Sequence, residues 1–405
     1  MHPLRNELHN ELHARPSIYF DEPAHVFHLT LLGDSPGYEP IIQQLSPGTA
    51  TQAQGMAQLD GLALKWERHT EFLSLTLVMP KQAEGELWPQ MPVALRNLVA
   101  GREHLILECS HILVESSATW SGYISHYGFK DPAGSEIGAG DAVVWSDFRL
   151  SSDGTTRLLL VNQGLNAYRL GRMVRRLLEI ETYRMMASLA VPVAKEVSSF
   201  LTTHERELVR LSEANAAMDE GDAKQILAQI STLSADVVSC TARTRQRFSA
   251  TDAYAQLVFE RIGELREGHV AGCQRLGVFI ERRFKPTVRY CSATCERLQR
   301  LYGNVANLGE LLQARVQVEV EEQNNAILQS LSTRATTQIK IQKAVEGLSI
   351  IAISYYLLSL LKLLYQGAHS LGLQATPKEA LTYLTPVAIL LLAAIASHIR
   401  KTRQA

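Results

Sequence analysis

Two long apolar stretches near the C-terminus interrupt an otherwise mixed pattern of hydrophobic and polar positions. Residues Gly347–Tyr365 contain one charged side chain, Lys362, and residues Leu381–Ile399 contain no Asp, Glu, Lys or Arg. Each stretch is 19 residues long, and as a helix it spans roughly 28 Å, close to the thickness of the bilayer hydrocarbon core. We therefore expect a hairpin of two transmembrane helices over residues 347–399, surrounded by membrane lipid.

Basic residues flank the expected inner ends of these two spans: Lys340, Lys343, Arg400, Lys401 and Arg403. The connecting segment, Gln366–Ala380, contains Lys378 as its one basic residue, beside Glu379. Because Lys and Arg accumulate on the cytoplasmic side of a membrane, both termini are expected in the cytoplasm of a bacterial cell, with the protein in the inner membrane.

The first 165 residues alternate strand-like runs with connections rich in Gly, Pro and Ser, which predicts a cytoplasmic α/β domain. Strands are expected at His25–Leu32, Glu71–Met79, His104–Glu108, Ala142–Phe148 and Thr156–Asn162. Helical periodicity is expected around Gln52–Leu59 and Val93–Ala100. Residues Gly134–Asp141 are glycine-rich but lead into a strand, so a hairpin loop is expected there rather than a phosphate cradle.

From Asn166 onward the pattern becomes helical, so the whole chain is expected to be α+β. A helical pair is predicted over residues 166–285, interrupted at Pro192 and near Gly268. A long antiparallel stalk helix is predicted from Pro286 to residue 346, where it enters the membrane. Its apolar residues recur at spacings of three and four, which indicates a packing seam: Leu298, Leu301, Val305, Leu308 and Leu312, then Val316, Val320, Ile327, Leu331, Ile341, Val345 and Leu348.

The composition narrows the function classes. The net charge of −1 argues against nucleic acid as a partner. The five cysteines, an odd number in a chain whose N-terminus does not look like a secretory signal, indicate reduced thiols in the cytosol. Ser110, His111 and Glu115 lie close in sequence, but no Gly-x-Ser-x-Gly motif frames a serine. The sequence therefore predicts no enzymatic activity.

Two family resemblances follow from particular residues. The opening HPLRNELHNELHARP, His2–Pro16, and the IAISYYL of Ile351–Leu357 resemble a bacterial family of uncharacterised membrane-anchored proteins, over the whole chain. The order of domain, helical stalk and short C-terminal hairpin is similar to CorA-type divalent-metal transporters. That resemblance implies a homo-oligomer, a pentamer in that family, with the first span lining a pore. The Gly-Met-Asn found at the outer end of that span is absent, and Tyr365-Gln366-Gly367 stands there.

Two sets of residues are candidates for a site. His9 and His13 are separated by one helical turn, which is a metal-ligand spacing for a divalent ion. The alternative is an N-terminal helix whose polar side chains clamp the α/β domain, and no other cofactor is expected. On the first span, one face carries small and polar residues that suit either a pore wall or helix packing: Ser349, Ala352, Tyr356, Ser359 and Gln366.

These observations predict an oligomeric membrane-anchored protein with two alternative functions. One is movement of ions through a CorA-like assembly of identical subunits. The other is a scaffold or regulator that is anchored in the membrane and transports nothing.

Overall fold

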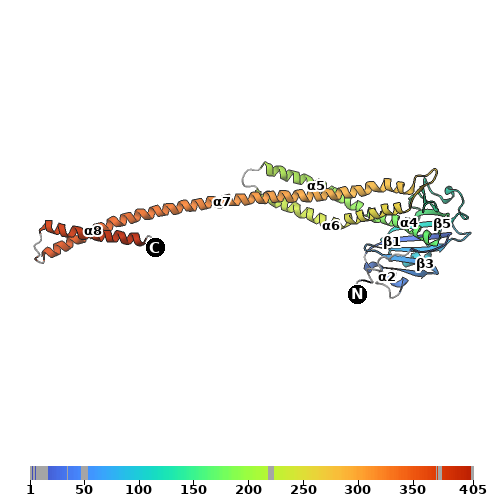
Figure 1. The fold of residues 1–405 in the computed structure, drawn as a ribbon, viewed down its shortest axis with the longest axis horizontal. Coiled ribbons are helices and arrows are strands. Elements are labelled where there is room, and N and C mark those ends of the chain that lie inside the picture. Colours follow the sequence, from blue (N-terminus) through green and yellow to red (C-terminus); the bar gives the residue numbers. More distant parts are fainter. Residues whose placement is uncertain are drawn as a thin grey trace. The chain divides into compact units, whose positions relative to one another are not determined.

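The structure is a computed structural model, and it describes residues 2, 5, 17–33, 35–46, 53–217, 223–370, 372 and 376–402. The chain divides into two compact units, which we call unit 1, Met1–Leu312, and unit 2, Gln313–Ala405. Unit 1 contains a β-sheet and several helices, and unit 2 is helical (Figure 1). The expected α+β class is confirmed. The division into residues 1–165, 166–285, 286–346 and 347–399 stays a prediction.

Within the described residues of unit 1, one mixed sheet contains nine strands in the order β2-β3-β4-β1-β5-β8-β7-β6-β9. β5 and β8 pair in parallel, and the other neighbours are antiparallel. The strands are β1 Ala24–Leu32, β2 Gln54–Leu59, β3 Leu62–Arg68, β4 Phe72–Pro80, β5 Ile106–Ser116, β6 Ala133–Ile137, β7 Ala142–Ser146, β8 Thr156–Asn162 and β9 Gly268–His269.

Four of the expected strands are confirmed as β1, β4, β7 and β8. The fifth is displaced, because residues Glu103–Leu105 form a 3-10 turn and β5 follows it to Ser116. The glycine-rich segment before β7 is confirmed as part of a hairpin, although its first residues form β6.

The helix expected around Gln52–Leu59 is wrong, because Gln54–Leu59 is β2. Asp60 and Gly61 follow it with φ of 49° and 78°. Two consecutive positive φ values fit a two-residue turn that joins twisted antiparallel strands. The Asp-Gly turn therefore pairs β2 with β3, and that pairing outweighs the weak helical periodicity.

Each face of the sheet is covered by helices. Helices α2 (Ser35–Leu45) and α3 (Val93–Leu98) pack on one face, against apolar residues of β1, β3 and β4. Helices α4 (Ala167–Ser188) and α6 (Ala223–Glu264), with the first turns of α7 (Leu276–Ser370), pack on the other. We call this second face of the sheet the helix face.

The helix boundaries follow from local chemistry. α4 begins after Asn166, as expected, and the Asn166 side chain accepts a hydrogen bond from the Arg169 N–H. The interruption expected at Pro192 lies three residues earlier, at Leu189, where α5 (Ala190–Ala216) follows α4. Pro192 lies in the first turn of α5, where a missing N–H costs little. The break near Gly268 is confirmed between α6 and α7.

The prediction that the long helix begins at Pro286 is wrong, because α7 begins at Leu276 and includes Pro286. Two N–H groups at its start, which have no acceptor within the helix, donate to side chains outside it: Leu276 N to Ser135 Oγ and Gly277 N to Glu267 Oε1, both at 2.8 Å. Leu276 and Phe284 are buried in the core under the helix face, and this burial offsets the backbone hydrogen bond that Pro286 cannot make.

The expected seam of α7 is buried in unit 1. Its residues pack against α5 and α6 in a core of their own, with exposed fractions between 0% and 8%: Leu298, Leu301, Val305, Leu308 and Leu312. Unit 2 contains the rest of α7 and α8 (Pro377–Thr402). There the described apolar side chains of α7 are largely exposed.

Candidate functional site

The helix face of the sheet is apolar at its ends but contains a block of polar side chains in the middle. Residues of a strand alternate between the two faces, and β1 directs Val26, His28 and Thr30 to the helix face. Strands β3, β4 and β5 each direct two polar residues, separated by one position, to the same face. The eight polar residues are His28 and Thr30 (β1), Ser74 and Thr76 (β4), Lys65 and Glu67 (β3), and Glu108 and Ser110 (β5).

Strand register aligns these eight residues in two adjacent rows, which we call the polar rows. One row contains Lys65, Thr76, His28 and Ser110, each the direct partner of the next across the sheet. The other row contains Glu67, Ser74, Thr30 and Glu108 in the same strand order. Because direct partners in a sheet place their side chains about 5 Å apart, the register brings together residues from four separate parts of the sequence.

His28 is the centre of a hydrogen-bonded network in these rows. Its Nδ1 lies 2.8 Å from Thr76 Oγ1, and its Nε2 lies 3.1 Å from Thr182 Oγ1, which belongs to α4. Thr182 Oγ1 also lies 3.2 Å from Thr30 Oγ1. A hydroxyl can donate or accept, so the two threonines satisfy the neutral imidazole in either tautomer. The network links the sheet to α4.

Glu108 lies at the end of this network and is buried. It accepts hydrogen bonds from Thr30 Oγ1, at 3.3 Å, and from the Ser110 hydroxyl. The pKa of Glu108 is raised from 4.5 to about 8. Burial is the largest cause and the nearby Glu181 carboxylate acts in the same direction, whereas the Ser110 hydrogen bond and Arg184 act against them. The carboxyl group is therefore protonated at neutral pH.

His28 is also uncharged at neutral pH. The pKa of its imidazole is lowered to about 3, mainly by burial and in smaller part by the positive charge of the neighbouring Lys65. The 3.8 Å contact between His28 Nε2 and Glu108 Oε2 therefore joins two neutral groups. The centre of the polar rows is a neutral network, because a buried charge without a full set of partners is costly.

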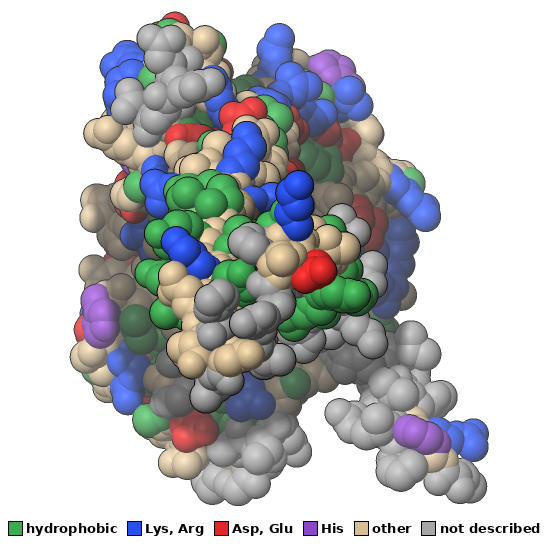
Figure 2. Space-filling model, turned by 90° about the vertical axis from the view of Figure 1, so that its left-hand side faces the viewer, with side chains coloured by type: hydrophobic (Ala, Val, Ile, Leu, Met, Phe, Trp, Pro, Cys, Tyr) green, Lys and Arg blue, Asp and Glu red, His purple; other side chains and the backbone are tan. Residues whose placement is uncertain are grey.

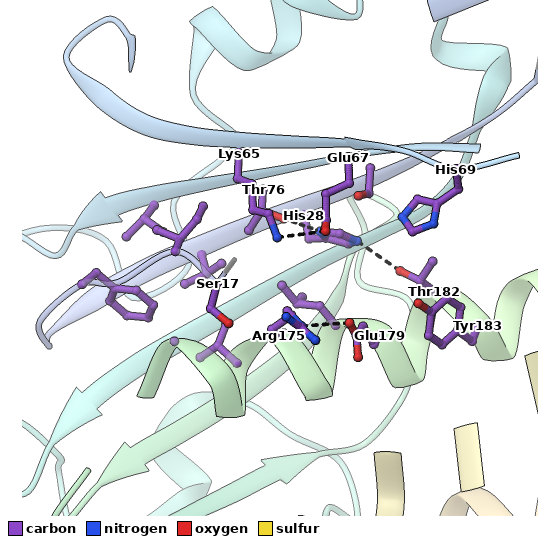
Figure 3. Close-up of a pocket in the computed structure, with 18 of the residues that line it drawn as sticks. Ser17, His28, Lys65, Glu67, His69, Thr76, Arg175, Glu179, Thr182 and Tyr183 are labelled. Carbon is purple, nitrogen blue, oxygen red and sulfur yellow. Dashed lines mark hydrogen bonds and ion pairs between the residues drawn. The ribbon is translucent and has the colours of Figure 1, made fainter. Parts of the chain in front are cut away.

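Charged groups lie at the edge of a cavity between the polar rows and α4 (Figure 3). Lys65 Nζ pairs with Glu67 Oε1 at 3.0 Å on the sheet, and Arg175 Nε pairs with Glu179 Oε1 at 2.9 Å on α4. Burial lowers the pKa of Lys65, and the Glu67 carboxylate acts against that shift. The charges thus occur as pairs around a neutral interior.

The cavity between the polar rows and α4 has a volume of about 40 Å³. A buried water needs roughly 10–15 Å³ of such space and two to four polar partners, so about three waters fit beside His28, Thr76 and Thr182. A metabolite-sized ligand does not fit. The arrangement can hold water, exchange a proton at Glu108 and fix α4 on the sheet.

Other candidate groups nearby are not arranged for catalysis. Cys109 is half-buried. Loss of solvent around its thiol raises the pKa to about 12, so it is not a reactive thiolate at neutral pH. Ser110 faces α4, whereas the alternating neighbours His111 and Glu115 face the opposite side of the sheet. Within the described part of the chain, no group of three or more His, Cys, Asp or Glu side chains is placed to hold a metal ion.

The candidates from the sequence do not contribute to this cavity. His9 and His13 lie outside the described residues, so the metal hypothesis for them stays a prediction. The expected pore-facing residues lie on the part of α7 that belongs to unit 2, and Tyr356 is 72% exposed. Ser349, Ala352 and Gln366 are exposed as well, and Ser359 is partly buried.

Sequence analysis missed the polar rows, although a signal was present. Each of the four strands has two polar residues at positions i and i+2, such as His28 and Thr30 in β1 and Ser74 and Thr76 in β4. That pattern places polar groups on one buried face of each strand. The register that aligns the four pairs depends on how the strands pair, and the sequence of a single strand does not predict it.

Comparison with known proteins yields a family and little more. A family model with the description "Protein of unknown function (DUF3422)" matches residues 1–403. The expectation of an uncharacterised family is thereby confirmed over nearly the whole chain. No curated protein matches the sequence. Among solved structures, the full-length CmaX protein is similar at 11% identity, with 94% of this chain and 99% of that chain covered and a TM-score of 0.21.

Proposed function

We propose that this chain, which belongs to the DUF3422 family of proteins of unknown function, is a membrane-anchored subunit of a homo-oligomer with CorA-like architecture that moves ions across the bacterial inner membrane. The observation that carries this proposal is the exposed surface of α7 in unit 2. Helix α7 is long and apolar enough to cross a membrane, with a mean hydropathy of 1.8 over its most apolar window and none of that window buried.

Lipid is the partner that this surface fits. Each exposed apolar side chain in water costs about 25 cal/mol per Å², and Ile351, Leu358 and Leu364 are all more than half exposed. Hydrophobic side chains also gather on the end of unit 2 that faces the viewer in Figure 2. Leu381–Ala394 of α8 is a shorter apolar helix, and with the flanking apolar residues it supplies the second span of the proposed anchor.

The orientation in the proposal rests on charge. Lys340 and Lys343 precede the first span, and Arg400, Lys401 and Arg403 follow the second. Basic residues remain on the cytoplasmic side, so the sheet of unit 1 and both termini are placed in the cytoplasm. Fusion of a reporter to residue 405 tests this, and a periplasmic signal would contradict it.

A second copy of the chain is the proposed partner of the stalk before the membrane. Ile327, Leu331, Ile341 and Val345 continue the 3–4 spacing of the buried seam, yet each is more than half exposed in a single chain. Copies that share one membrane and one orientation present the same residues at the same height. This geometry favours parallel packing of identical seams around a symmetry axis.

Ion movement is proposed because polar groups lie on the continuation of that seam into the membrane. Ser349 Oγ donates to the Val345 carbonyl at 2.9 Å, so this hydroxyl is satisfied by its own helix. Among the described residues, no hydrogen-bond partner accompanies the polar groups of Tyr356, Ser359 or Gln366. Such groups are unfavourable against lipid, so water along an axis or a neighbouring helix is their expected partner.

Anchoring without transport is the alternative, and one observation favours it. The Gly-Met-Asn of CorA-type transporters is absent, with Tyr365-Gln366-Gly367 in its place. A packed axis would then satisfy the same polar groups through contacts between helices, and the protein would act as a membrane-bound scaffold or regulator.

Water access separates the two functions. Ser359→Cys should react with a soluble thiol reagent in membranes if a conduit exists. Leu361→Cys, about 200° away around the helix, is the matched control and should stay unreactive. In liposomes, Tyr356→Ala should increase divalent-ion flux several-fold because it removes the largest ring from the proposed axis. Absence of flux in the wild type and in Tyr356→Ala, with Ser359→Cys inert, would leave the anchored scaffold as the function.

A further inference from the structure

A second cavity in unit 1 is larger than the one at the polar rows and differs from it in charge. It has a volume of about 370 Å³ and lies between the loops that flank β6 and β7, the end of α4 and the first turns of α7. Four cationic side chains line it: Lys130, Arg149, Arg184 and Arg283. The two carboxylates in its lining are Asp131 and Asp147.

The carboxylates do not neutralise these cations. Asp147 accepts hydrogen bonds from two backbone N–H groups, those of Lys130 at 3.0 Å and Arg149 at 3.2 Å. Arg184 pairs with Glu181 at 2.7 Å. Within the part of the chain that the structure describes, no carboxylate forms an ion pair with Lys130, Arg149 or Arg283. Three positive charges therefore face the cavity without a partner of opposite sign.

The aromatic wall of this cavity is fixed in place. Phe148 has a φ of 51°, a conformation that costs energy for a residue with a side chain. Its N–H donates to Ser146 Oγ at 3.0 Å, and its ring stacks on Phe279 with centroids 5.1 Å apart. The Arg283 guanidinium lies 3.7 Å from the Phe279 ring centroid. The strained turn thus aligns an aromatic surface beside the unpaired cations.

We propose that this cavity binds a small soluble ligand that carries a phosphate group and a planar ring. Guanidinium groups are suited to bidentate contacts with phosphate oxygens, and the unpaired charges of Lys130, Arg149 and Arg283 match a phosphate dianion. The exposed part of the Phe148 ring provides a stacking surface. The volume falls in the range of small-molecule sites. This site does not depend on whether the protein conducts ions.

A third cavity shows that a lining rich in arginine does not by itself decide the assignment. It has a volume of about 240 Å³ and is also rich in arginine. Two of its arginines are already paired, Arg169 with Asp141 at 2.5 Å and Arg176 with Glu264 at 2.7 Å, and it has no aromatic wall. Its exposed Arg172 lines this other cavity and provides a control with the same change of charge.

Calorimetric titration of the detergent-solubilised full chain tests the proposal, with adenosine monophosphate and inorganic phosphate as probes at constant ionic strength. Wild type should bind both saturably, and adenosine monophosphate more tightly. Arg149→Gln with Arg283→Gln should raise both dissociation constants at least tenfold, whereas Arg172→Gln should change them less than twofold. If the double variant unfolds, as judged by circular dichroism, Arg149→Gln alone is the substitute, because Arg149 is exposed on a loop and its change should leave the fold intact. This single variant should raise both dissociation constants at least threefold.

Two further arms test the ring and the source of the phosphate. Phe148→Gly relieves the strained conformation and removes the stacking surface. It should therefore weaken the binding of adenosine monophosphate several-fold and leave the binding of inorganic phosphate unchanged. Soluble dihexanoyl phosphatidate represents a lipid headgroup, and it should bind more weakly than adenosine monophosphate. The proposal is overturned by absence of saturable binding, by equal losses in the arginine variants and the Arg172→Gln control, by equal effects of Phe148→Gly on both probes, or by tighter binding of the phosphatidate.

Discussion

Two stretches of α7 have the same spacing of large apolar residues but different surroundings. In unit 1, the seam from Leu298 to Leu312 is at most 8% exposed, because α5 and α6 of the same chain cover it. In unit 2, Ile327, Leu331 and Leu348 continue that spacing and are between 54% and 67% exposed. A seam indicates that a helix face needs a partner, and the partner can be inside or outside the chain.

Polar groups differ between the units in the same way. In unit 1, Thr182 and Thr30 are buried and bonded to each other and to His28. In unit 2, the described chain gives Tyr356 and Ser359 no hydrogen-bond partner. The seam and these threonines of unit 1 therefore find their partners within the chain, whereas the corresponding groups of unit 2 require the proposed lipid and subunit partners. The following predictions test that difference.

The largest effect is expected at the buried seam. Leu308→Asp should lower the free energy of unfolding of unit 1 by about 3–5 kcal/mol, because it removes a packed side chain and buries a carboxylate without a partner. Leu311→Asp is the matched control, since Leu311 is 65% exposed three residues away, and it should cost less than about 0.5 kcal/mol. Thermal unfolding followed by circular dichroism measures both. Similar melting temperatures for the two variants would show that α5 and α6 do not cover the seam in solution.

A smaller effect is expected from the pH dependence of Glu108. Its pKa is raised from 4.5 to about 8, so between these values the folded state keeps a proton that the unfolded state releases. Stability due to this group therefore falls as the pH rises through that window and is constant above it. The pKa values of His25, His28 and His111 are lowered to about 4, 3 and 3. Their titration therefore changes the free energy of unfolding only below about pH 6.5.

Between pH 6.5 and 8, Glu108 is thus the buried group of the polar rows expected to dominate. Wild type should lose up to about 2 kcal/mol over this interval, since one pKa unit corresponds to about 1.4 kcal/mol. Glu108→Gln should remove this dependence, and the exposed Glu84→Gln should retain it. Denaturant titrations at several pH values provide the test. An unchanged slope in Glu108→Gln would mean that the carboxyl group is already ionised in the folded protein.

The smallest effect is expected at Thr182. Thr182→Val keeps the shape of the side chain but removes the hydroxyl that contacts His28 and Thr30, which should cost about 1–2 kcal/mol. Thr202→Val is the control, because Thr202 is exposed on α5 and its hydroxyl contacts only the Ser198 carbonyl at 2.9 Å among the described residues. Equal losses in the two variants would show that the network does not hold α4 on the sheet.

Local patterns predicted much of the fold. β8 has the expected bounds, and α4 begins directly after Asn166, where the pattern was expected to become helical, because alternation and helical periodicity depend on neighbours in sequence. The two errors have different causes. β2 forms a hairpin with β3 through the Asp60-Gly61 turn, a local signal that the weak helical periodicity obscured. The start of α7 depends on the side chains of Ser135, which is distant in sequence, and Glu267, which lies outside the helix.

The site was harder to predict than the fold. His28, Thr76 and Glu108 come from three strands, and their contact depends on a register that the sequence does not state. The cationic cavity likewise joins Lys130, Arg149 and Arg283 from separate segments. The seam of α7 was predicted from spacing alone, but spacing could not say that its internal partners end near Leu312.

Disulfide crosslinking in native membranes tests the central claim that the exposed seam of unit 2 packs against the same seam of another copy. Leu331→Cys lies on the seam, and Gln329→Cys lies about 200° around the helix; crosslinking by the native cysteines is measured in wild type and subtracted. We expect Leu331→Cys to give a covalent dimer on mild oxidation, while Gln329→Cys stays monomeric. Equal crosslinking of the two variants, or none above wild type in Leu331→Cys, would contradict the claim.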